Sequence, residues 1–467
     1  MERHRHATAT LPSLKPRPPL AELYECGRLL RDKCPRGAHA TWRSPPRRAE
    51  PLHLLHQSCA GRLTELVPVR YGRMLRSPFM FYRGAALNMA ADLAHLPVSG
   101  IRVQACGDCH LSNFGAFATP ERRIVVDIND FDETLPAPWE WDVKRLATSF
   151  VLASRDNGHT QRQARDAAIA CVRAYRTRMA ELSRMSILDV WYATTELEPL
   201  IPMVQDRETR MRARKRLEKV RSRSVAEHDF PKLVASDGGA LTFKDNPPLV
   251  FHPHDRSHAA FVATVRKAFW SYRESLSEHH RALLDRYELI DIAIKIVGVS
   301  SVGTRCSVML MMAGEKDPLF LQIKEAQRSV LEPYAGRSTY ANHGQRVVAG
   351  QRRLQTASDL FLGWTAGSDG RHYYVRQLRD MKIKPLVEEF PPSAMIQYAN
   401  LCGSILARAH ARCSEPAVIS GYLGRSDRFD EAIADFAIAY ADQTERDHRA
   451  LEKAVRAGEV EVLTEAA

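Results

Sequence analysis

The chain has 467 residues, of which 45% are hydrophobic and 26% charged, with a formal net charge of +12 and nine cysteines. It is long enough for a large core and more than one lobe. No apolar run reaches the roughly 18 residues of a membrane span, and neither a secretory signal nor a nucleic-acid-binding motif is present.

The scattered, odd-numbered cysteines favour a reduced, cytoplasmic compartment. The excess of positive charge fits either an ordinary solvated basic surface or a surface that binds anionic ligands. Residues 1–50 are rich in Pro, Arg and His and lack periodicity, so we expect a poorly ordered basic arm there.

The next elements surround two short polar segments. Residues 84–96 place Met89, Leu93 and Leu96 at helical spacing before a proline. "GIRVQACGD" is typical of a strand that enters a loop, and "NFGAFATPERRIVVDINDFDE" of a β-hairpin.

Helices are expected over 142–190 and 205–228. Residues 289–297, 305–313, 318–324 and 371–382 are β-rich, and 431–442 carries a helical apolar stripe. The order predicts an α+β protein.

The loop "ACGDCHLSNFGAF" admits two interpretations. Cys106, Cys109 and His110 form the C-x-x-C-H string of c-type haem attachment. That chemistry belongs to exported proteins and disagrees with the cysteine pattern, and a zinc site would lack a second C-x-x-C pair. The alternative is Asp108 followed five residues later by Asn113, the spacing of a phosphoryl-transfer catalytic loop.

A second polar segment supports the phosphoryl-transfer interpretation. "DINDFDE" contributes Asp127, Asp130 and Asp132 at the end of a predicted strand. Carboxylate and amide oxygens are the ligands that Mg²⁺ prefers, together with water and substrate phosphates. Two loops at the ends of neighbouring strands would bring these groups together with Asn113.

These residues resemble the protein-kinase-like superfamily, especially its aminoglycoside phosphotransferase and choline kinase branch. There the loop is H-G-D-x-x-x-x-N, a hairpin follows, and the next strand ends in I-D-F-x-D. This chain has Gly107, Asp108 and Asn113, and then "INDFD" from residue 128. Cys106 stands in place of the His, and the longer hairpin leaves open whether Asp127 or Asp130 holds the metal; the D-F-D string favours Asp130.

Further along, "PAPWEWDVKRLATS" is similar to the segment that follows the metal motif in those phosphotransferases. The resemblance implies that Asp142 is a structural residue that bonds the catalytic-loop backbone. His110 would either shape the acceptor site or bond backbone. Most of the chain, including "SPFMFYRGAA" and "LARAHAR", also resembles an uncharacterised bacterial family, domain of unknown function 2252.

A kinase-like enzyme needs a small sheet with a Gly-rich loop over the phosphates and a strand Lys that pairs with them. Here these parts follow the catalytic loop: Gly298 and Gly303 flank a tight loop, and Lys324 ends a β run in "LFLQIKEA". Arg305 would touch phosphate or stay an exposed strand residue. Glu332 is a candidate partner for Lys324, or that partner is absent.

We therefore expect a two-lobed, circularly permuted protein-kinase-like fold, with the helical catalytic lobe before the small antiparallel nucleotide lobe. The expected segments are a basic arm, catalytic-lobe helices with the catalytic loop and metal hairpin, a β-rich nucleotide lobe and C-terminal helices that complete the catalytic lobe, at 1–50, 51–285, 286–385 and 386–467.

The resemblance implies phosphoryl transfer from ATP with Mg²⁺ to the hydroxyl of an unidentified small molecule. Asp108 would be the catalytic base, Asn113 and Asp130 the metal ligands with Asp132 in support, and Lys324 the phosphate partner. Nucleotidyl transfer, a metal-dependent phosphoesterase and a non-catalytic nucleotide-binding scaffold remain alternatives.

Overall fold

The computed structural model describes residues 17–221, 230–237, 240–247, 249–252, 256–296, 298–299, 301–378 and 381–463. The start of the expected basic arm and the end of the expected helix 205–228 lie outside these residues. Helices and antiparallel sheets are both present, as the α+β class requires. None of the described helices is both long enough and apolar enough to cross a membrane.

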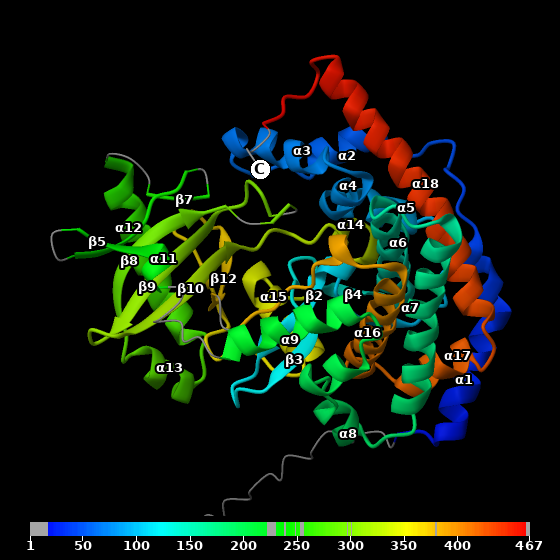
Figure 1. Cartoon of the computed structure of the whole chain (residues 1–467). Coiled ribbons are helices and arrows are strands. Elements are labelled where there is room, and N and C mark those ends of the chain that lie inside the picture. Colours follow the sequence, from blue (N-terminus) through cyan, green and yellow to red (C-terminus); the bar gives the residue numbers. More distant parts are fainter. Residues whose placement is uncertain are drawn as a thin grey trace, which may run out of the picture.

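Six described strands form one antiparallel sheet on the left of Figure 1, in the order β11-β12-β10-β9-β8-β7. The strands are β7 (Val250–Phe251), β8 (Glu288–Lys295), β9 (Cys306–Ala313), β10 (Asp317–Glu325), β11 (Gly363–Ala366) and β12 (His372–Gln377). The strands expected over 289–297, 305–313 and 318–324 are thus confirmed, with small shifts at their ends. The strand expected over 371–382 is confirmed over 372–377, and residues 297, 379 and 380 lie outside the described range.

Both faces of this sheet are covered, which explains the continuous apolar run "VMLMM" in β9. Met309 and Met311 pack in one cluster with Tyr272 of α12 (Arg256–Glu274), whereas Val308 and Leu310 pack in another with Phe243. Phe243 belongs to the small hairpin of β5 (Val234–Asp237) and β6 (Ala240–Phe243). The short helices α11 (Phe230–Leu233) and α13 (Glu278–Leu284) complete this region.

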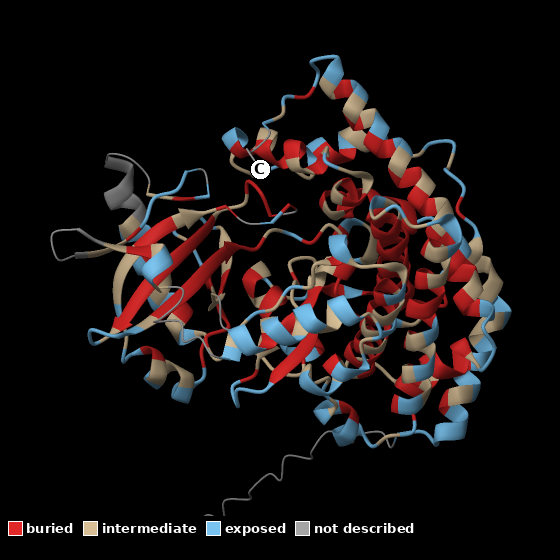
Figure 2. Ribbon diagram, viewed as in Figure 1, coloured by how far each residue is buried: buried red, intermediate tan, exposed pale blue. Residues whose placement is uncertain are grey.

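A helical body lies on the right of Figure 1 and holds the largest apolar cluster. Its main helices are α1 (Leu20–Lys33), α6 (Trp139–Asp156), α7 (Gln161–Leu182), α16 (Pro392–Ala411), α17 (Pro416–Leu423) and α18 (Arg428–Arg456). Nearly every residue of α6 is buried, as the red central helix of Figure 2 shows. The expected helical stripe at 431–442 lies in α18 and is buried.

Shorter helices at the top of Figure 1 and around the body connect these parts. They are η1 (Arg36–Ala40), α2 (Pro51–Gln57), η2 (Thr64–Leu66), α3 (Val67–Met74), α4 (Pro78–Gly84), α5 (Ala86–Leu93), η3 (Leu111–Asn113), α8 (Ile187–Tyr192), η4 (Glu198–Met203), α9 (Arg207–Arg221), α14 (Glu332–Ala335), α15 (His343–Leu354) and η5 (Val387–Glu389). The helix expected over 84–96 is α5, and the helices expected over 142–190 are α6, α7 and α8.

Two hairpin-like pairs lie between the sheet and the helical body. The strands β2 (Phe114–Ala118) and β3 (Ile124–Ile128) form the hairpin expected from the sequence, and β1 (Arg102–Ala105) pairs with β4 (Leu135–Pro138). These four strands frame the two polar segments 106–113 and 127–134.

Residues 17–50 differ from the expected poorly ordered arm. Helix α1 packs along α17, and Gly27 approaches the carbonyl of Val418 so closely that a Cβ would overlap it. Arg31 donates a 2.8 Å hydrogen bond to the carbonyl of Tyr422. The Pro-rich composition of this region gave no signal for a helix. Helix α1 is stabilised by its packing against α17 rather than by a periodic pattern that the sequence shows.

Candidate functional site

The loop after β1 is held by a glycine turn and by hydrogen bonds from its backbone amides to the Asp142 side chain. Gly107 has a φ of 86°, and a Cβ at this position would overlap the carbonyl of Glu133, so only glycine fits. The Asp142 carboxylate, in the first turn of α6, accepts hydrogen bonds from the amides of Cys106 (2.6 Å) and Gly107 (3.0 Å). Nε2 of His410 in α16 lies 3.2 Å from the same carboxylate. This buried anchor sets the position of the following residue, Asp108.

Asp108 is nearly enclosed, with 12% of its side chain exposed. Its Oδ1 accepts a 2.7 Å hydrogen bond from Nε of Arg145, one turn beyond Asp142 on α6, and forms an ion pair with Nη2 of the same guanidinium at 2.5 Å. Burial raises the pKa of Asp108 to about 7, although the Arg145 guanidinium opposes the shift. A carboxylate with this pKa is suited to accept a proton near neutral pH.

His110 is buried next to Asp108 and does not face open solvent. It is 3% exposed, and its Nε2 is 4.0 Å from Oδ2 of Asp108. Burial and the neighbouring Arg83 and Arg145 charges hold the pKa of His110 well below its usual range. The ring is therefore neutral, and its Nδ1 has no hydrogen-bond partner among the described residues.

Asn113 and Asp130 supply oxygen atoms close to Asp108. Asn113 Nδ2 donates to the carbonyl of Asp108 at 2.7 Å, and the Asn113 carbonyl accepts from the amide of Asn129 at 2.7 Å, which joins the two polar segments. Asp130 Oδ1 accepts a 3.2 Å hydrogen bond from the amide of Asp132. Within the described part of the chain, Oδ1 of Asn113 and Oδ2 of Asp130 have no partner. They are hard oxygen ligands of the kind that fits Mg²⁺.

Asp132 lies at the boundary between the sheet and the helical body. Its carboxylate accepts hydrogen bonds from Lys324 Nζ (2.7 Å) and the Tyr374 hydroxyl (2.6 Å), and Ser301 Oγ lies 3.4 Å away. Burial opposes ionisation of Asp132, but the Lys324 ammonium and the hydrogen bonds hold its pKa below the usual range. Its oxygens are thus more fully occupied than those of Asp130.

Asp127 is not brought to this cluster. It is completely buried, and it pairs with Arg408 of α16 and accepts from the amide (2.9 Å) and hydroxyl (2.9 Å) of Thr356. Its lone pairs therefore face these donors rather than the cluster of Asp108, Asn113 and Asp130.

The expected Gly-rich loop packs on the N-terminal helices. Gly298 and Gly303 have φ values of 70° and 85°, while residues 297 and 300 lie outside the described range. Arg73 donates to the carbonyl of Gly298, and Arg62 Nη1 donates to that of Val302 at 2.6 Å. The loop carbonyls are therefore tied to α3 and the segment before η2, while Ser301 points toward Asp132.

The remaining candidates lie apart from the acidic cluster. The backbone amide of Arg305 donates to Glu325 at 3.0 Å, and its guanidinium donates to the carbonyl of Gly61 at 3.1 Å. Glu332 accepts from Arg328 at 2.8 Å. Lys324 is thus paired with Asp132, and among the described residues neither Glu325 nor Glu332 forms an ion pair with it.

Helix α15 lies between the sheet and the hairpin segments. It has no acidic residue, and its buried Arg346 donates to the carbonyls of Asp132 (2.8 Å) and Thr134 (2.7 Å). The helix therefore holds the acidic segment through its backbone, and it leaves the Asp132 carboxylate to Lys324.

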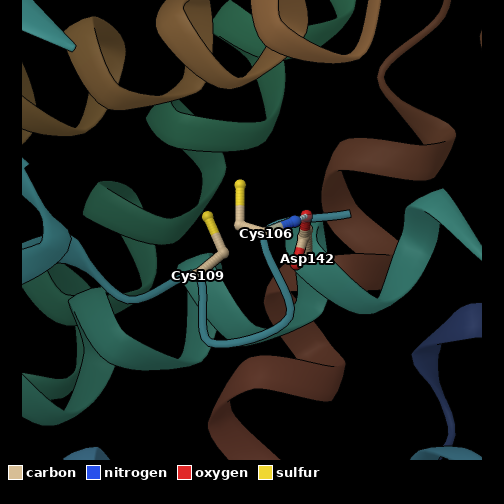
Figure 3. Close-up of side chains that lie close together, drawn as sticks. All are labelled: Cys106, Cys109 and Asp142. Atoms are coloured by element: carbon tan, nitrogen blue, oxygen red, sulfur yellow. Dashed lines mark hydrogen bonds between the residues drawn. The ribbon is translucent and has the colours of Figure 1, made fainter. Parts of the chain in front are cut away.

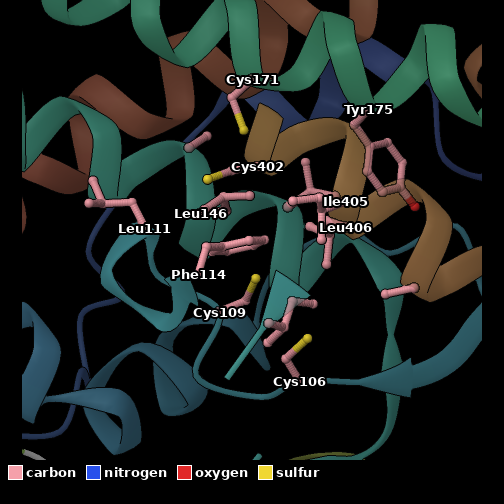
Figure 4. Packing of buried hydrophobic residues seen from close by; sticks show 14 of the residues in the cluster. Cys106, Cys109, Leu111, Phe114, Leu146, Cys171, Tyr175, Cys402, Ile405 and Leu406 are labelled. Atoms are coloured by element: carbon pink, nitrogen blue, oxygen red, sulfur yellow. The ribbon is translucent and has the colours of Figure 1, made fainter. Parts of the chain in front are cut away.

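Three buried residues near the loop have the composition of a metal site. The ligand atoms of Cys106, Cys109 and Asp142 lie within 4.8 Å of one another (Figure 3). Both Asp142 oxygens already accept backbone hydrogen bonds. The hydrogen bond with Cys109 and burial raise the pKa of the Cys106 thiol, and burial raises that of Cys109. Protonated thiols are poor metal ligands, and both side chains pack in the apolar core with Leu146 and Cys402 (Figure 4).

A family model described as "Uncharacterized protein conserved in bacteria (DUF2252)" matches residues 62–454. The chain belongs to the DUF2252 family. No curated protein and no solved structure matches this DUF2252 chain. The matched range includes both polar segments, 106–113 and 127–134, and Lys324.

The structure adds residues to the site of this DUF2252 chain that the sequence did not single out as ligands. Tyr374 lies directly opposite Lys324 in the β10–β12 register, and Arg376 follows on the same face. Arg376 Nη1 donates to the carbonyl of Asn129 at 3.2 Å. The alternation of side chains along "YYVRQ" indicates which residues share a face of the strand. Placing Tyr374 opposite Lys324 also requires the pairing register with β10.

Proposed function

We propose that this DUF2252 protein is an ATP- and Mg²⁺-dependent phosphotransferase with a circularly permuted protein-kinase-like arrangement, acting on the hydroxyl of a small molecule. The ion pair between Lys324 and Asp132 carries the proposal. It joins a strand of the six-stranded sheet to the acidic segment across 192 residues of sequence. A strand Lys held at the acidic segment, next to the expected metal ligands, matches the position of the phosphate-pairing Lys in kinase-type phosphoryl transfer.

The order of the elements supports permutation. The catalytic loop and hairpin come first, and the sheet with its Gly298–Gly303 loop and Lys324 comes later. Helix α15 packs against β11 and β12, and α16 then contributes His410 to the carboxylate that anchors the catalytic loop. If the two halves of the chain were exchanged, a helix late in the sequence would support a loop early in the sequence, as α16 does here.

In the proposed reaction Asp108 accepts the proton of the acceptor hydroxyl. Its pKa of about 7 supports this role, because the deprotonated form is abundant at neutral pH while a proton is still taken up readily. Asn113 and Asp130 would hold Mg²⁺, which neutralises charge on the transferred phosphoryl group. Lys324 exchanges its contact with Asp132 for the nucleotide phosphates, and Arg145 keeps Asp108 oriented.

Calorimetry with Mg·ATP tests the proposal. The wild type should bind, Asp130→Asn should lose most of its affinity, and Asp166→Asn, a half-exposed carboxylate on α7, should behave as the wild type. Release of ADP in single turnovers then separates a phosphotransferase from a nucleotide-binding scaffold.

Two further results would contradict the proposal. If the wild type does not bind Mg·ATP, the kinase-like resemblance reflects ancestry alone. If Lys324→Ala retains full turnover of a phosphate ester, the acidic cluster is that of a metal-dependent phosphoesterase, which does not need a phosphate-pairing Lys.

A further inference from the structure

A pocket of about 370 Å³ lies where the sheet region meets the helical body, and we call it the junction pocket. Ser277 and His280 at α13 line it from the sheet side, and Trp191 of α8 and Arg412 at the end of α16 line it from the helical body. Helix α13 packs in the apolar cluster of the sheet, and α8 in that of the body. Both helices are on the lower side of Figure 1. The volume is in the range of pockets that hold small organic molecules.

The lining of the junction pocket is almost wholly polar. Besides Trp191, it consists of serine, threonine, glutamine, histidine, arginine and aspartate side chains. Two of these residues, Arg352 and Arg412, are cations, and one, Asp359, is an acid. A pocket for an apolar ligand presents mainly aliphatic and aromatic side chains instead. The composition therefore points to a ligand that carries charge.

Asp359 is held by backbone amides rather than by either arginine. Its Oδ1 accepts a 2.8 Å hydrogen bond from the amide of Phe361, and its Oδ2 accepts from the amide of Gln377. Its charge favours the ionised form of Arg352, but in the part of the chain that the structure describes no ion pair joins it to Arg352 or Arg412. The wall of the pocket therefore keeps an excess of positive charge.

Arg412 is fixed in place and has one edge free. Its Nε donates to the carbonyl of Arg353 at 3.0 Å and its Nη1 to that of Trp191 at 2.5 Å, and its guanidinium carbon lies 3.9 Å from the centre of the Trp191 ring. Its Nη2 has no partner among the described residues. Burial and the charge of Arg408 lower the pKa of Arg412 to about 10. A fixed guanidinium without a carboxylate partner is preorganised to bind an anion.

Arg352, in the last turn of α15, is a second guanidinium with unused donors in this pocket. Its Nη2 donates to the carbonyl of Leu362 at 2.7 Å, whereas its Nε and Nη1 have no partner within the described ranges. Burial and the charges of His279 and Arg352 lower the pKa of His280, so the His280 ring that lines the pocket is neutral at neutral pH. Both arginines of the pocket are thus bonded to carbonyls only.

Two other lining residues turn their polar atoms away from the pocket and toward the β2–β3 hairpin. Gln355 Nε2 donates to the carbonyl of Ile128 at 2.6 Å, and the amide and hydroxyl of Thr356 donate to Asp127 at 2.9 Å. These donors are used within the protein. The unused donors of the two arginines are therefore the groups best placed to hold a ligand.

We propose that the junction pocket binds a small organic acid through Arg352 and Arg412. Its oxyanion, which is either a carboxylate or a phosphate ester, accepts hydrogen bonds from the unused N–H groups of both guanidinium groups. The pocket has more room than a bare inorganic ion fills, and Trp191 supplies an apolar wall for an organic body. The inference does not depend on the proposed function, because the pocket shares no lining residue with the acidic cluster.

Calorimetry with phenyl phosphate and with benzoate tests the pocket, since each probe joins an oxyanion to a flat organic body. The wild type should bind at least one probe, and Arg352→Gln and Arg412→Gln should each weaken binding about tenfold or more. The matched control is Arg353→Gln, because Arg353 is an exposed neighbour on α15 that does not line the pocket. This control should bind as the wild type. The probe that binds more tightly identifies the preferred oxyanion.

Arg412 also bonds two carbonyls, so its replacement can lower stability as well as affinity. Thermal melting of every variant checks that the fold is retained, and Arg412→Lys, which keeps the charge, should recover part of the affinity. Benzamide, the neutral counterpart of benzoate, should bind more weakly than benzoate. Equal binding of benzamide and benzoate would show that charge is not recognised, and it would overturn the proposal.

The outcomes for the pocket and for the enzyme are separate. Asp130→Asn should bind the probes as the wild type does, and Mg·ATP should not displace them. Probe binding that depends on Arg352 in a protein that does not bind nucleotide would support the pocket and overturn the proposed function. Displacement of the probes by Mg·ATP, absence of probe binding in the wild type, or equal binding in the wild type and both glutamine variants would overturn the pocket.

Discussion

Replacement of Asp127 by asparagine should greatly destabilise the fold without directly removing a metal ligand. Asp127 is 0% exposed, and its Oδ1 accepts from Arg408 and from the amide of Ile128 at 2.8 Å, while its Oδ2 accepts from the amide and hydroxyl of Thr356. Asparagine preserves the volume but turns one acceptor oxygen into a donor. It also leaves the charge of Arg408, itself 2% exposed, without a counterion.

The expected cost follows from this burial. Removing one partner of a buried ion pair costs about 3–5 kcal/mol, which is at least about a fifth of the roughly 5–15 kcal/mol that stabilises a typical domain. Nε and Nη1 of Arg408 are already buried without hydrogen-bond partners, so the described surroundings offer no compensating acceptor. The double variant Asp127→Asn/Arg408→Met removes both charges and should regain most of the loss.

Urea denaturation measures this difference as a lower midpoint with an unchanged slope. Asp130→Asn is the matched control, because Asp130 accepts a single local hydrogen bond and its replacement should cost less than about 1 kcal/mol. If Asp127→Asn were as stable as the wild type but no longer bound Mg²⁺, then Asp127 would be the metal ligand and the preference for Asp130 would be wrong.

Four further predictions concern the site. Because the pKa of Asp108 is raised to about 7, turnover should increase as the pH rises through about 7, and Asp108→Asn should abolish this rise. Because the pKa of Asp108 is raised, its protonated form stabilises the fold fully below the ordinary carboxyl pKa, and this contribution is lost as the pH rises through about 7. Urea midpoints at several pH values measure this loss. A midpoint independent of pH in this range would contradict the prediction. Lys324→Met should destabilise the fold by about 3 kcal/mol, since Asp132 loses its counterion, and should lower Mg·ATP affinity in calorimetry; unchanged affinity would refute its role at the phosphates. Gly107→Ala should cost more unfolding free energy than Gly314→Ala, because both residues have positive φ but only Gly107 touches neighbouring backbone; equal losses would refute the close approach.

The sequence alone predicted the strands and the polar segments because their signals are local. The β runs that became β8, β9 and β10 are apolar and end at turn residues, and the spacing of Asp108 and Asn113 lies within one loop. The placement of Lys324 on the last of these strands followed from the same pattern.

The partners of these residues could not be predicted in the same way. The ion pair between Asp127 and Arg408 depends on how α16 crosses the hairpin, and no periodic pattern in either segment predicts it. Such contacts are set by tertiary packing, which overrides local propensity.

The distant partner of Asp127 has a consequence for the synthesis of the protein. Arg408 follows Asp127 by 281 residues, and Lys324 follows Asp132 by 192. While the ribosome makes the chain, the acidic hairpin therefore emerges long before the cations that neutralise it, and the centre cannot close until α16 has been released. Contacts of such long sequence separation fold slowly and leave exposed intermediates. A nascent chain arrested before residue 408 should therefore be a better substrate for chaperones and proteases than the finished protein.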